Sequence, residues 1–87
     1  MKVPTVHLNG TSKAALLEQA YSAAEALTRA LDALAEASPN GRDYYPQGDG
    51  ALAQALTEHR QRVEAVRRVR DEMVALYEAV YDIGGGH

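Results

Sequence analysis

Two long heptad patterns of apolar residues constrain this chain more than any other feature. In the first pattern, the apolar positions are Leu17, Ala20, Ala24, Leu27, Leu31 and Leu34. Alternating spacings of three and four residues place these side chains along one side of an α-helix, with the charged residues away from it. Thr11 and Ser12 supply a hydroxyl for the N-cap, and Pro39 disfavours helical geometry in the residue before it. The sequence therefore predicts a helix over residues 13–37.

A second heptad pattern follows residue 50 and includes one histidine. Its first positions are Leu52, Leu56, His59, Val63 and Val66. A helix of 3.6 residues per turn drifts against a strict heptad, and the apolar set is expected to slip beyond Val66. After the slip, the expected positions are Val69, Met73, Leu76, Val80 and Ile83. With Asp49 as the N-cap and the glycines at 84–86 as the stop, the sequence predicts a helix over residues 50–82.

These two helices predict an all-α fold, in which an antiparallel two-helix hairpin assembles with copies of itself into a helical bundle. The hairpin covers residues 13–83 with a loop at 38–49, and residues 84–87 are expected to form a flexible tail. Alanine at many seam positions allows close helix approach but buries little apolar area, and the 87 residues include no Phe or Trp. A homo-oligomer is therefore expected.

Residues 1–12 are expected to form a short extended N-terminal arm. Its alternating residues place Val6 and Leu8 inward, and Asn9-Gly10 is a strong turn dipeptide. Because the second helix is longer than the first, its last turns are expected to extend past the start of the first helix and to pack against this arm.

Composition narrows the classes of function. The net charge is −3, whereas a general nucleic-acid binder would carry a basic excess. The sequence has no cysteine, no apolar run as long as a membrane span and no signal-peptide pattern at its amino terminus. A cytoplasmic protein without a membrane or general nucleic-acid partner is therefore expected.

No catalytic constellation can be assembled from the available residues. His7, His59 and His87 share no metal-ligand spacing, and no activated nucleophile or paired carboxylates accompany them. His59 falls on the apolar stripe and is interpreted as a core histidine with one hydrogen bond, and Ser12 as a helix cap. We therefore expect a protein that is not an enzyme and that has no cofactor or metal site.

The connection between the helices, SPNGRDYYPQGDG at residues 38–50, is longer than most helix connections in bundles. Its turn residues flank a guanidinium, a carboxylate and two aromatic rings. The candidate ligand-binding residues here are Asn40, Arg42, Asp43, Tyr44, Tyr45 and Gln47. Two interpretations stay open: a loop that packs on itself and closes the end of the bundle, and a surface that binds a ligand or partner.

A second polar motif lies at the opposite end of the predicted hairpin. Its candidate ligand-binding residues are His7, Asn9, Thr11 and Ser12. An antiparallel dimer would bring this end of one chain beside the loop of its neighbour. The combined amide, hydroxyl, guanidinium and aromatic groups would suit a small anion such as a nucleotide.

Charge is segregated along the second helix. Five arginines and one glutamate between residues 60 and 70 give a net charge of +4, and four acidic residues between 71 and 82 give −4. This pattern favours antiparallel pairing of two copies of the helix. An anion-binding role for the arginines stays open as the alternative, because the guanidinium suits phosphate and carboxylate groups.

The motifs TVHLNGTS (residues 5–12) and PNGRDYYPQG (residues 39–48), joined by an alanine-rich helix, resemble a group of short, mostly uncharacterised proteins encoded by tailed phages and prophages. The resemblance covers nearly the whole chain and implies a viral protein in the cytoplasm of a bacterial host. Small helical phage proteins include oligomeric sponges that sequester the cyclic nucleotides of bacterial immune signalling. By analogy, such counter-defence is the first function expected. The alternative is a phage structural, assembly or protein-interaction module with no small-molecule ligand.

Overall fold

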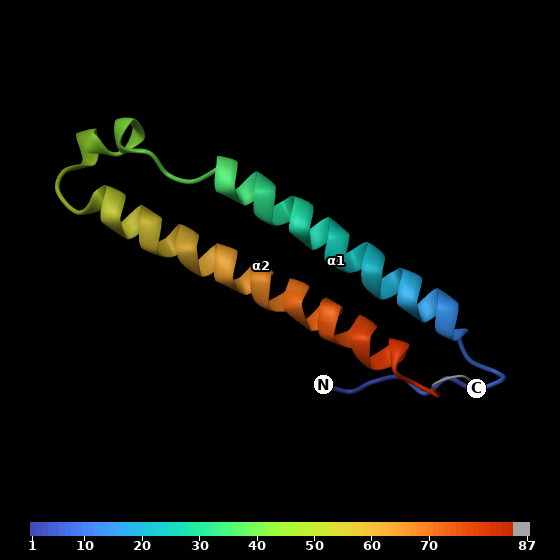
Figure 1. Cartoon of the computed structure of the whole chain (residues 1–87). Coiled ribbons are helices and arrows are strands. Elements are labelled where there is room, and N and C mark those ends of the chain that lie inside the picture. The colour runs from blue at the N-terminus through green and yellow to red at the C-terminus, as the bar shows by residue number, and fades with distance from the viewer. Residues whose placement is uncertain (85–87) are drawn as a thin grey trace.

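The computed structural model describes residues 1–84, which form two long helices folded back on each other (Figure 1). Helix α1 spans Lys13–Glu36 and helix α2 spans Ala51–Tyr81. The predicted antiparallel hairpin is confirmed, because the two helices pack against each other along the molecule. Two short 3₁₀ turns, η1 (Gly41–Asp43) and η2 (Tyr45–Gln47), lie in the connection. The molecule measures 62 × 19 × 19 Å, and no helix among the described residues is long and apolar enough to cross a membrane.

The first helix begins and ends where its local sequence requires. The hydroxyl oxygen of Ser12 accepts a hydrogen bond of 3.1 Å from the backbone N–H of Ala15, which satisfies one of the unpaired donors of the first turn. The helix ends at Glu36, and Ala37 forms its C-cap, two residues before Pro39. The predicted start at residue 13 and the role of Ser12 as a cap are confirmed.

The second helix begins differently from the prediction. Gly50, not Asp49, is the N-cap residue, and no side chain caps this end. Gly50 has φ +87°, a left-handed conformation that costs a residue with a Cβ about 1–2 kcal/mol. The start of α2 therefore depends on the left-handed backbone conformation that glycine adopts easily, and not on a hydrogen bond from the Asp49 carboxylate.

At its other end, α2 stops at Tyr81, with Asp82 as the C-cap. Gly84 then adopts φ +63°, which is consistent with the predicted stop at the glycines. The rest of the predicted tail, residues 85–87, lies outside the described residues.

The register of the hairpin corrects the expected overhang. Lys13 at the start of α1 donates a hydrogen bond of 2.8 Å from Nζ to the carbonyl oxygen of Ile83, just past the end of α2. These ends are therefore level, and the predicted extension of the last turns of α2 is wrong. Because α2 has 31 residues and α1 has 24, the surplus of about 10 Å lies at the loop end instead (Figure 1).

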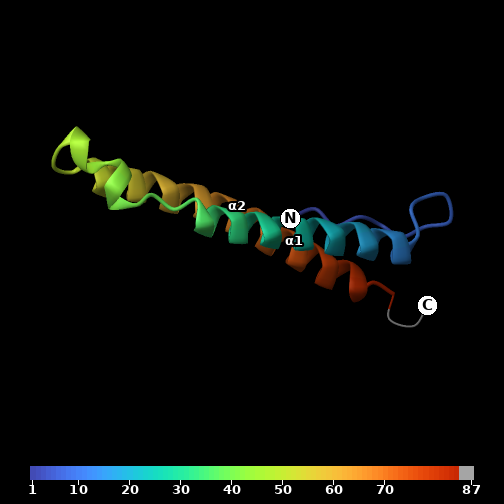
Figure 2. The same cartoon turned by 90° about the horizontal axis from the view of Figure 1, so that it is seen from above.

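The long connection accompanies this surplus. It continues past the end of α1 beside the first turns of α2, and then reverses direction to enter α2 (Figures 1 and 2). A Cβ placed on Gly41 would lie 3.6 Å from a methyl carbon of Leu52, which shows how closely the loop approaches the helix. The connection thus covers a helix segment that α1 does not reach.

The seam of α2 departs from the prediction at one position. Of the residues expected beyond Val66, four are half-buried or buried: Met73, Leu76, Val80 and Ile83. Val69, expected in the seam, is 46% exposed, and Arg70 is half-buried in its place. The heptad continues from Arg70 to Met73, Tyr77 and the buried Val80. Packing against α1 favours a repeat of about 3.5 residues per turn, and the half-buried Arg70 occupies the seam position there.

The core of the hairpin is small. Its buried residues are Ala20, Ala55, His59 and Val80. Most other seam residues are half-buried, because two helices alone leave the sides of the seam open to solvent.

The N-terminal arm lies alongside the C-terminal half of α2 (Figures 1 and 2). Val3, Pro4 and Val6 are half-buried there, and the inward position predicted for Val6 is confirmed. The prediction for Leu8 is wrong, since this side chain is 98% exposed. The turn that reverses the chain begins at His7 and places Leu8 at its outer tip.

Candidate functional site

The predicted polar motif before α1 is a tight turn. The backbone N–H of Gly10 donates a hydrogen bond of 3.1 Å to the carbonyl oxygen of His7, which confirms the turn expected at Asn9-Gly10. The imidazole of His7 folds over Gly10: a Cβ at that position would lie 2.7 Å from His7 Nε2. Asn9 and Thr11 are exposed. Of the four residues predicted to bind a ligand at this end, Ser12 is the one whose side chain caps α1.

The loop at the other end is built by its own hydrogen bonds. Asn40 Oδ1 accepts a hydrogen bond of 3.0 Å from the backbone N–H of Arg42 and caps η1. The N–H of Asp43 then donates to the carbonyl oxygen of Asn40, and that of Gln47 to Tyr44, at 3.2 and 3.0 Å. The loop is therefore an ordered platform, and the Asn40 side chain serves its structure.

The two loop tyrosines differ in burial. Tyr44 is half-buried, whereas Tyr45 is 79% exposed. Arg42, Asp43 and Gln47 are also exposed, and within residues 1–84 no side-chain hydrogen bond or ion pair holds the Arg42 guanidinium. Different residues of the loop fit the two interpretations. The half-buried Tyr44 suits a loop that packs on itself, and the exposed Tyr45 and Arg42 suit a binding surface.

The two predicted groups of ligand-binding residues do not meet within one chain. The turn at residues 7–12 and the loop at residues 38–50 lie at opposite ends of the hairpin (Figure 1), which is 62 Å long. A site that contains both groups requires a second chain, and the composite pocket stays a prediction.

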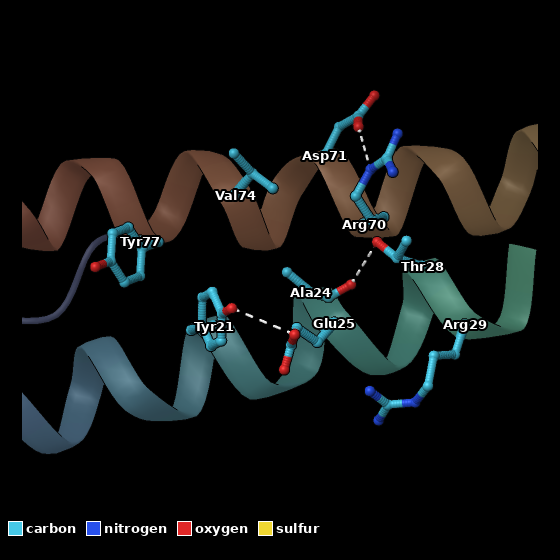
Figure 3. Close-up of a pocket in the computed structure, with 9 residues that line it drawn as sticks. All are labelled: Tyr21, Ala24, Glu25, Thr28, Arg29, Arg70, Asp71, Val74 and Tyr77. Atoms are coloured by element: carbon cyan, nitrogen blue, oxygen red, sulfur yellow. Dashed lines mark hydrogen bonds and ion pairs between the residues drawn. The ribbon is translucent and has the colours of Figure 1, made fainter.

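A groove that the sequence did not suggest lies between α1 and α2. It encloses about 650 Å³. Its lining residues, all labelled in Figure 3, are Tyr21, Ala24, Glu25, Thr28, Arg29, Arg70, Asp71, Val74 and Tyr77. Tyr21 and Tyr77 lie at one end of this lining, and Glu25, Arg29, Arg70 and Asp71 are its charged residues.

Local hydrogen bonds orient the polar groups of this groove (Figure 3). The Tyr21 hydroxyl donates to Glu25 Oε2 at 3.3 Å, one helical turn away. Arg70 Nε donates to Asp71 Oδ1 at 2.8 Å, which leaves the two terminal nitrogens of the guanidinium available. The groove therefore presents a cation held at a seam position beside exposed apolar carbon.

Aromatic rings close one end of the groove. The Tyr21 and Tyr77 rings lie 6.3 Å apart between centroids, and Tyr77 stacks on Tyr81 at 6.4 Å. Lys13 Nζ lies 5.7 Å from the centroid of Tyr81, within reach of a cation–π contact. Tyr21 is nevertheless largely exposed. At the end of the hairpin that carries the arm, contacts between tyrosine rings and the contact of Lys13 with Tyr81 thus join α1 to α2.

Sequence reasoning missed the groove because its exposed apolar residues flank the seam. Tyr21 follows the seam residue Ala20, and Val74 follows Met73. The signal was present, since an exposed Val and Tyr immediately after seam positions widen the apolar stripe on the same side of both helices.

The sequence singled out two further polar features, His59 and the arginine segment 60–70, and both lie on α2. His59 is 7% exposed, and its Nε2 lies 2.7 Å from the carbonyl oxygen of Leu34, which confirms the core histidine. In the arginine segment, Arg67 pairs with Glu64, and Arg70 with Asp71. Within the described part of the chain, no group of three or more His, Cys, Asp or Glu side chains could hold a metal ion.

Comparisons of this chain with protein families, with curated proteins and with solved structures found no match. The geometry of the hairpin, its two ends and its groove therefore carries the assignment of a function.

Proposed function

We propose that this protein is a non-enzymatic, self-assembling binding protein that holds a small anionic ligand between its subunits. Signalling nucleotides are the ligand class that combines the required negative charge with a base able to stack on tyrosine. In a phage-infected cell, the function would be sequestration of such a nucleotide, as in sponge-like counter-defence.

The exposure of Tyr45 is the observation that carries this proposal. An aromatic ring that is 79% exposed contributes little to the stability of its own chain, although the loop around it is ordered by backbone and Asn40 hydrogen bonds. Arg42 stands on the same loop with an exposed guanidinium. A stacking face and a cation on a loop held by its own hydrogen bonds suit the recognition of a nucleotide.

Self-assembly is supported by the incomplete burial of the hairpin. Its accessible surface is 6461 Å², whereas a compact monomer of 9.4 kDa exposes about 5,000 Å². Its radius of gyration is 19.0 Å, against about 12 Å for a compact chain of this length. Association of copies would cover this surplus and would place the turn of one chain near the loop of another.

Native mass spectrometry after incubation with a panel of cyclic and linear nucleotides tests the proposal. We expect an oligomer that retains one class of nucleotide in a fixed ratio to subunits, and chromatography of the released ligand should return it unchanged. An oligomer that retains no member of the panel would overturn the ligand, and release of a cleaved nucleotide would overturn the non-enzymatic character.

A second candidate is a structural or protein-interaction module with no small-molecule ligand. Leu8 favours it, since an apolar side chain that is 98% exposed at the tip of a turn is well placed to enter a pocket of another protein. Leu8→Ser would abolish such an interaction but would leave nucleotide binding by the oligomer intact.

A further inference from the structure

We infer that the groove between α1 and α2 is the docking surface for a second copy of this chain. The two copies would be related by a two-fold axis that crosses the groove at the level of Thr28 and Arg70 and makes them antiparallel. This inference rests on the self-assembly in the proposed function, and it adds the face, the direction and the register of the pairing.

The groove has the composition of an interface core with a charged rim. Tyr21, Val74 and Tyr77 present apolar and aromatic carbon around it, and Val74 is 41% exposed. The surplus surface of the hairpin, about 1,500 Å² above that of a compact monomer, exceeds the roughly 800 Å² per partner of a standard interface. The hairpin as a whole therefore exposes enough surplus surface for a standard interface with a second copy.

The register of the hairpin fixes the level of the groove. The Tyr21 and Tyr77 rings lie across the seam from each other. One heptad further along each helix, Thr28 on α1 comes level with Arg70 on α2, and both line the groove. Arg70 is also the last residue of the basic segment 60–70, and Asp71 is the first of the acidic segment.

Charge complementarity selects the antiparallel direction. A two-fold axis at Arg70, perpendicular to the helices, superposes residues 60–70 of one α2 on the level of residues 71–82 of the other. The net +4 segment of each copy then lies level with the net −4 segment of its partner, and Arg70 and Asp71, where the two segments join, line the groove itself. A parallel pair would instead place the segments of like charge of the two copies at the same level, which is unfavourable.

The same axis also brings the two polar ends together, although the groove and the charge pattern alone define its position. Ser12 lies 16 residues from Thr28, or about 24 Å along the helix axis. On the same side of the axis, the loop of the second copy extends between the levels of its Glu36 and Ala51, about 12 and 29 Å away. The turn of one chain is therefore level with the loop of the other.

A matched pair of charge substitutions tests the docking face. Val74→Glu places a carboxylate in the groove, and Val69→Glu places the same group on the same helix, at a residue of similar exposure that does not line the groove. Analytical ultracentrifugation should show association weakened about 100-fold or more by Val74→Glu, because each interface would bury unpaired carboxylates. Val69→Glu should leave association within about 3-fold of the parent.

Disulfide trapping tests the register, since the chain contains no cysteine of its own. Thr28→Cys, close to the axis, should form a covalent dimer under mild oxidation at micromolar concentration. Ala26→Cys, an exposed position that lines a different surface of α1, should remain largely monomeric on a non-reducing gel.

The outcomes separate this inference from the proposed function. A parent protein that is a folded monomer even far above the concentration used for trapping would overturn both. An oligomer that persists in Val74→Glu but dissociates in Val69→Glu would leave self-assembly standing and overturn the groove as its face. Trapping through Ala26→Cys in place of Thr28→Cys would overturn the register.

Discussion

His59 on α2 binds the backbone of α1 through Leu34: its Nε2 lies 2.7 Å from the Leu34 carbonyl oxygen, and the side chain is buried. A carbonyl oxygen only accepts hydrogen bonds, and Nε2 must therefore carry the proton in this contact. The pair joins the two helices close to the point where α1 ends. His59 therefore contributes both buried volume and a directional hydrogen bond, whereas the other buried side chains, Ala20, Ala55 and Val80, are small and apolar.

Removal of the His59 side chain should destabilise the hairpin substantially. We expect His59→Ala to lower the free energy of unfolding by about 2–4 kcal/mol, because it leaves a cavity and removes the bond to α1. Thr57→Ala, at an exposed position of the same helix, should change it by less than about 0.5 kcal/mol. Urea denaturation at one fixed protein concentration measures both, and equal effects would contradict the role of His59.

The two hydroxyls before α1 should differ in their contribution to stability. Ser12→Ala removes the acceptor for the Ala15 N–H and should cost about 1 kcal/mol. Thr11→Ala changes an exposed side chain that caps nothing, and its melting temperature should equal that of the parent. If Thr11→Ala lowered nucleotide affinity without any loss of stability, the residue would belong to the composite site.

The glycines of the loop should not tolerate a side chain equally. Gly48 has φ +97° and ψ −178°, a region that is essentially restricted to glycine, and Gly48→Ala should cost about 1–3 kcal/mol. Gly41→Ala is the control, because a Cβ there would make an ordinary contact of 3.6 Å with Leu52. Thermal melts that rank Gly41→Ala as the more damaging change would contradict the loop geometry.

The loop tyrosines should separate stability from binding. Tyr44→Ala should lower the melting temperature, since the ring is half-buried, whereas Tyr45→Ala should leave the melt unchanged. With the nucleotide that the native mass spectra identify, Tyr45→Ala should weaken binding by about 1–3 kcal/mol through lost stacking. Calorimetric titration that gives the parent affinity for Tyr45→Ala would remove Tyr45 from the site.

Arg42 should act on affinity alone. Arg42→Ala should weaken nucleotide binding by about 1.5–3 kcal/mol, the range for a hydrogen bond to a charged group, because the guanidinium is exposed in the free chain. Lys2→Ala provides a control for the loss of one exposed positive charge outside the loop, the groove and the basic segment 60–70. Equal losses in the two variants would indicate a general electrostatic effect rather than a contact in a pocket.

Local sequence determined the helices and most of their ends. The heptads of apolar residues, the hydroxyl of Ser12 and the glycine after residue 83 act within a few residues of where they stand, and helix formation depends on such local terms. The burial of His59 followed from its place in the stripe. The left-handed glycine that starts α2 was missed, because a carboxylate beside it offered an equally good cap by sequence alone.

Only the tertiary structure decided the register of the two helices and its consequences. Two helices of unequal length can align at either end, and the choice rests on contacts between residues far apart in the chain, such as Lys13 with Ile83. That alignment moved the surplus of α2 to the loop, and packing against α1 held the heptad through Arg70 and left Val69 outside the seam. The groove arises from the same packing, since side chains that flank two separate stripes form one surface only when the helices meet.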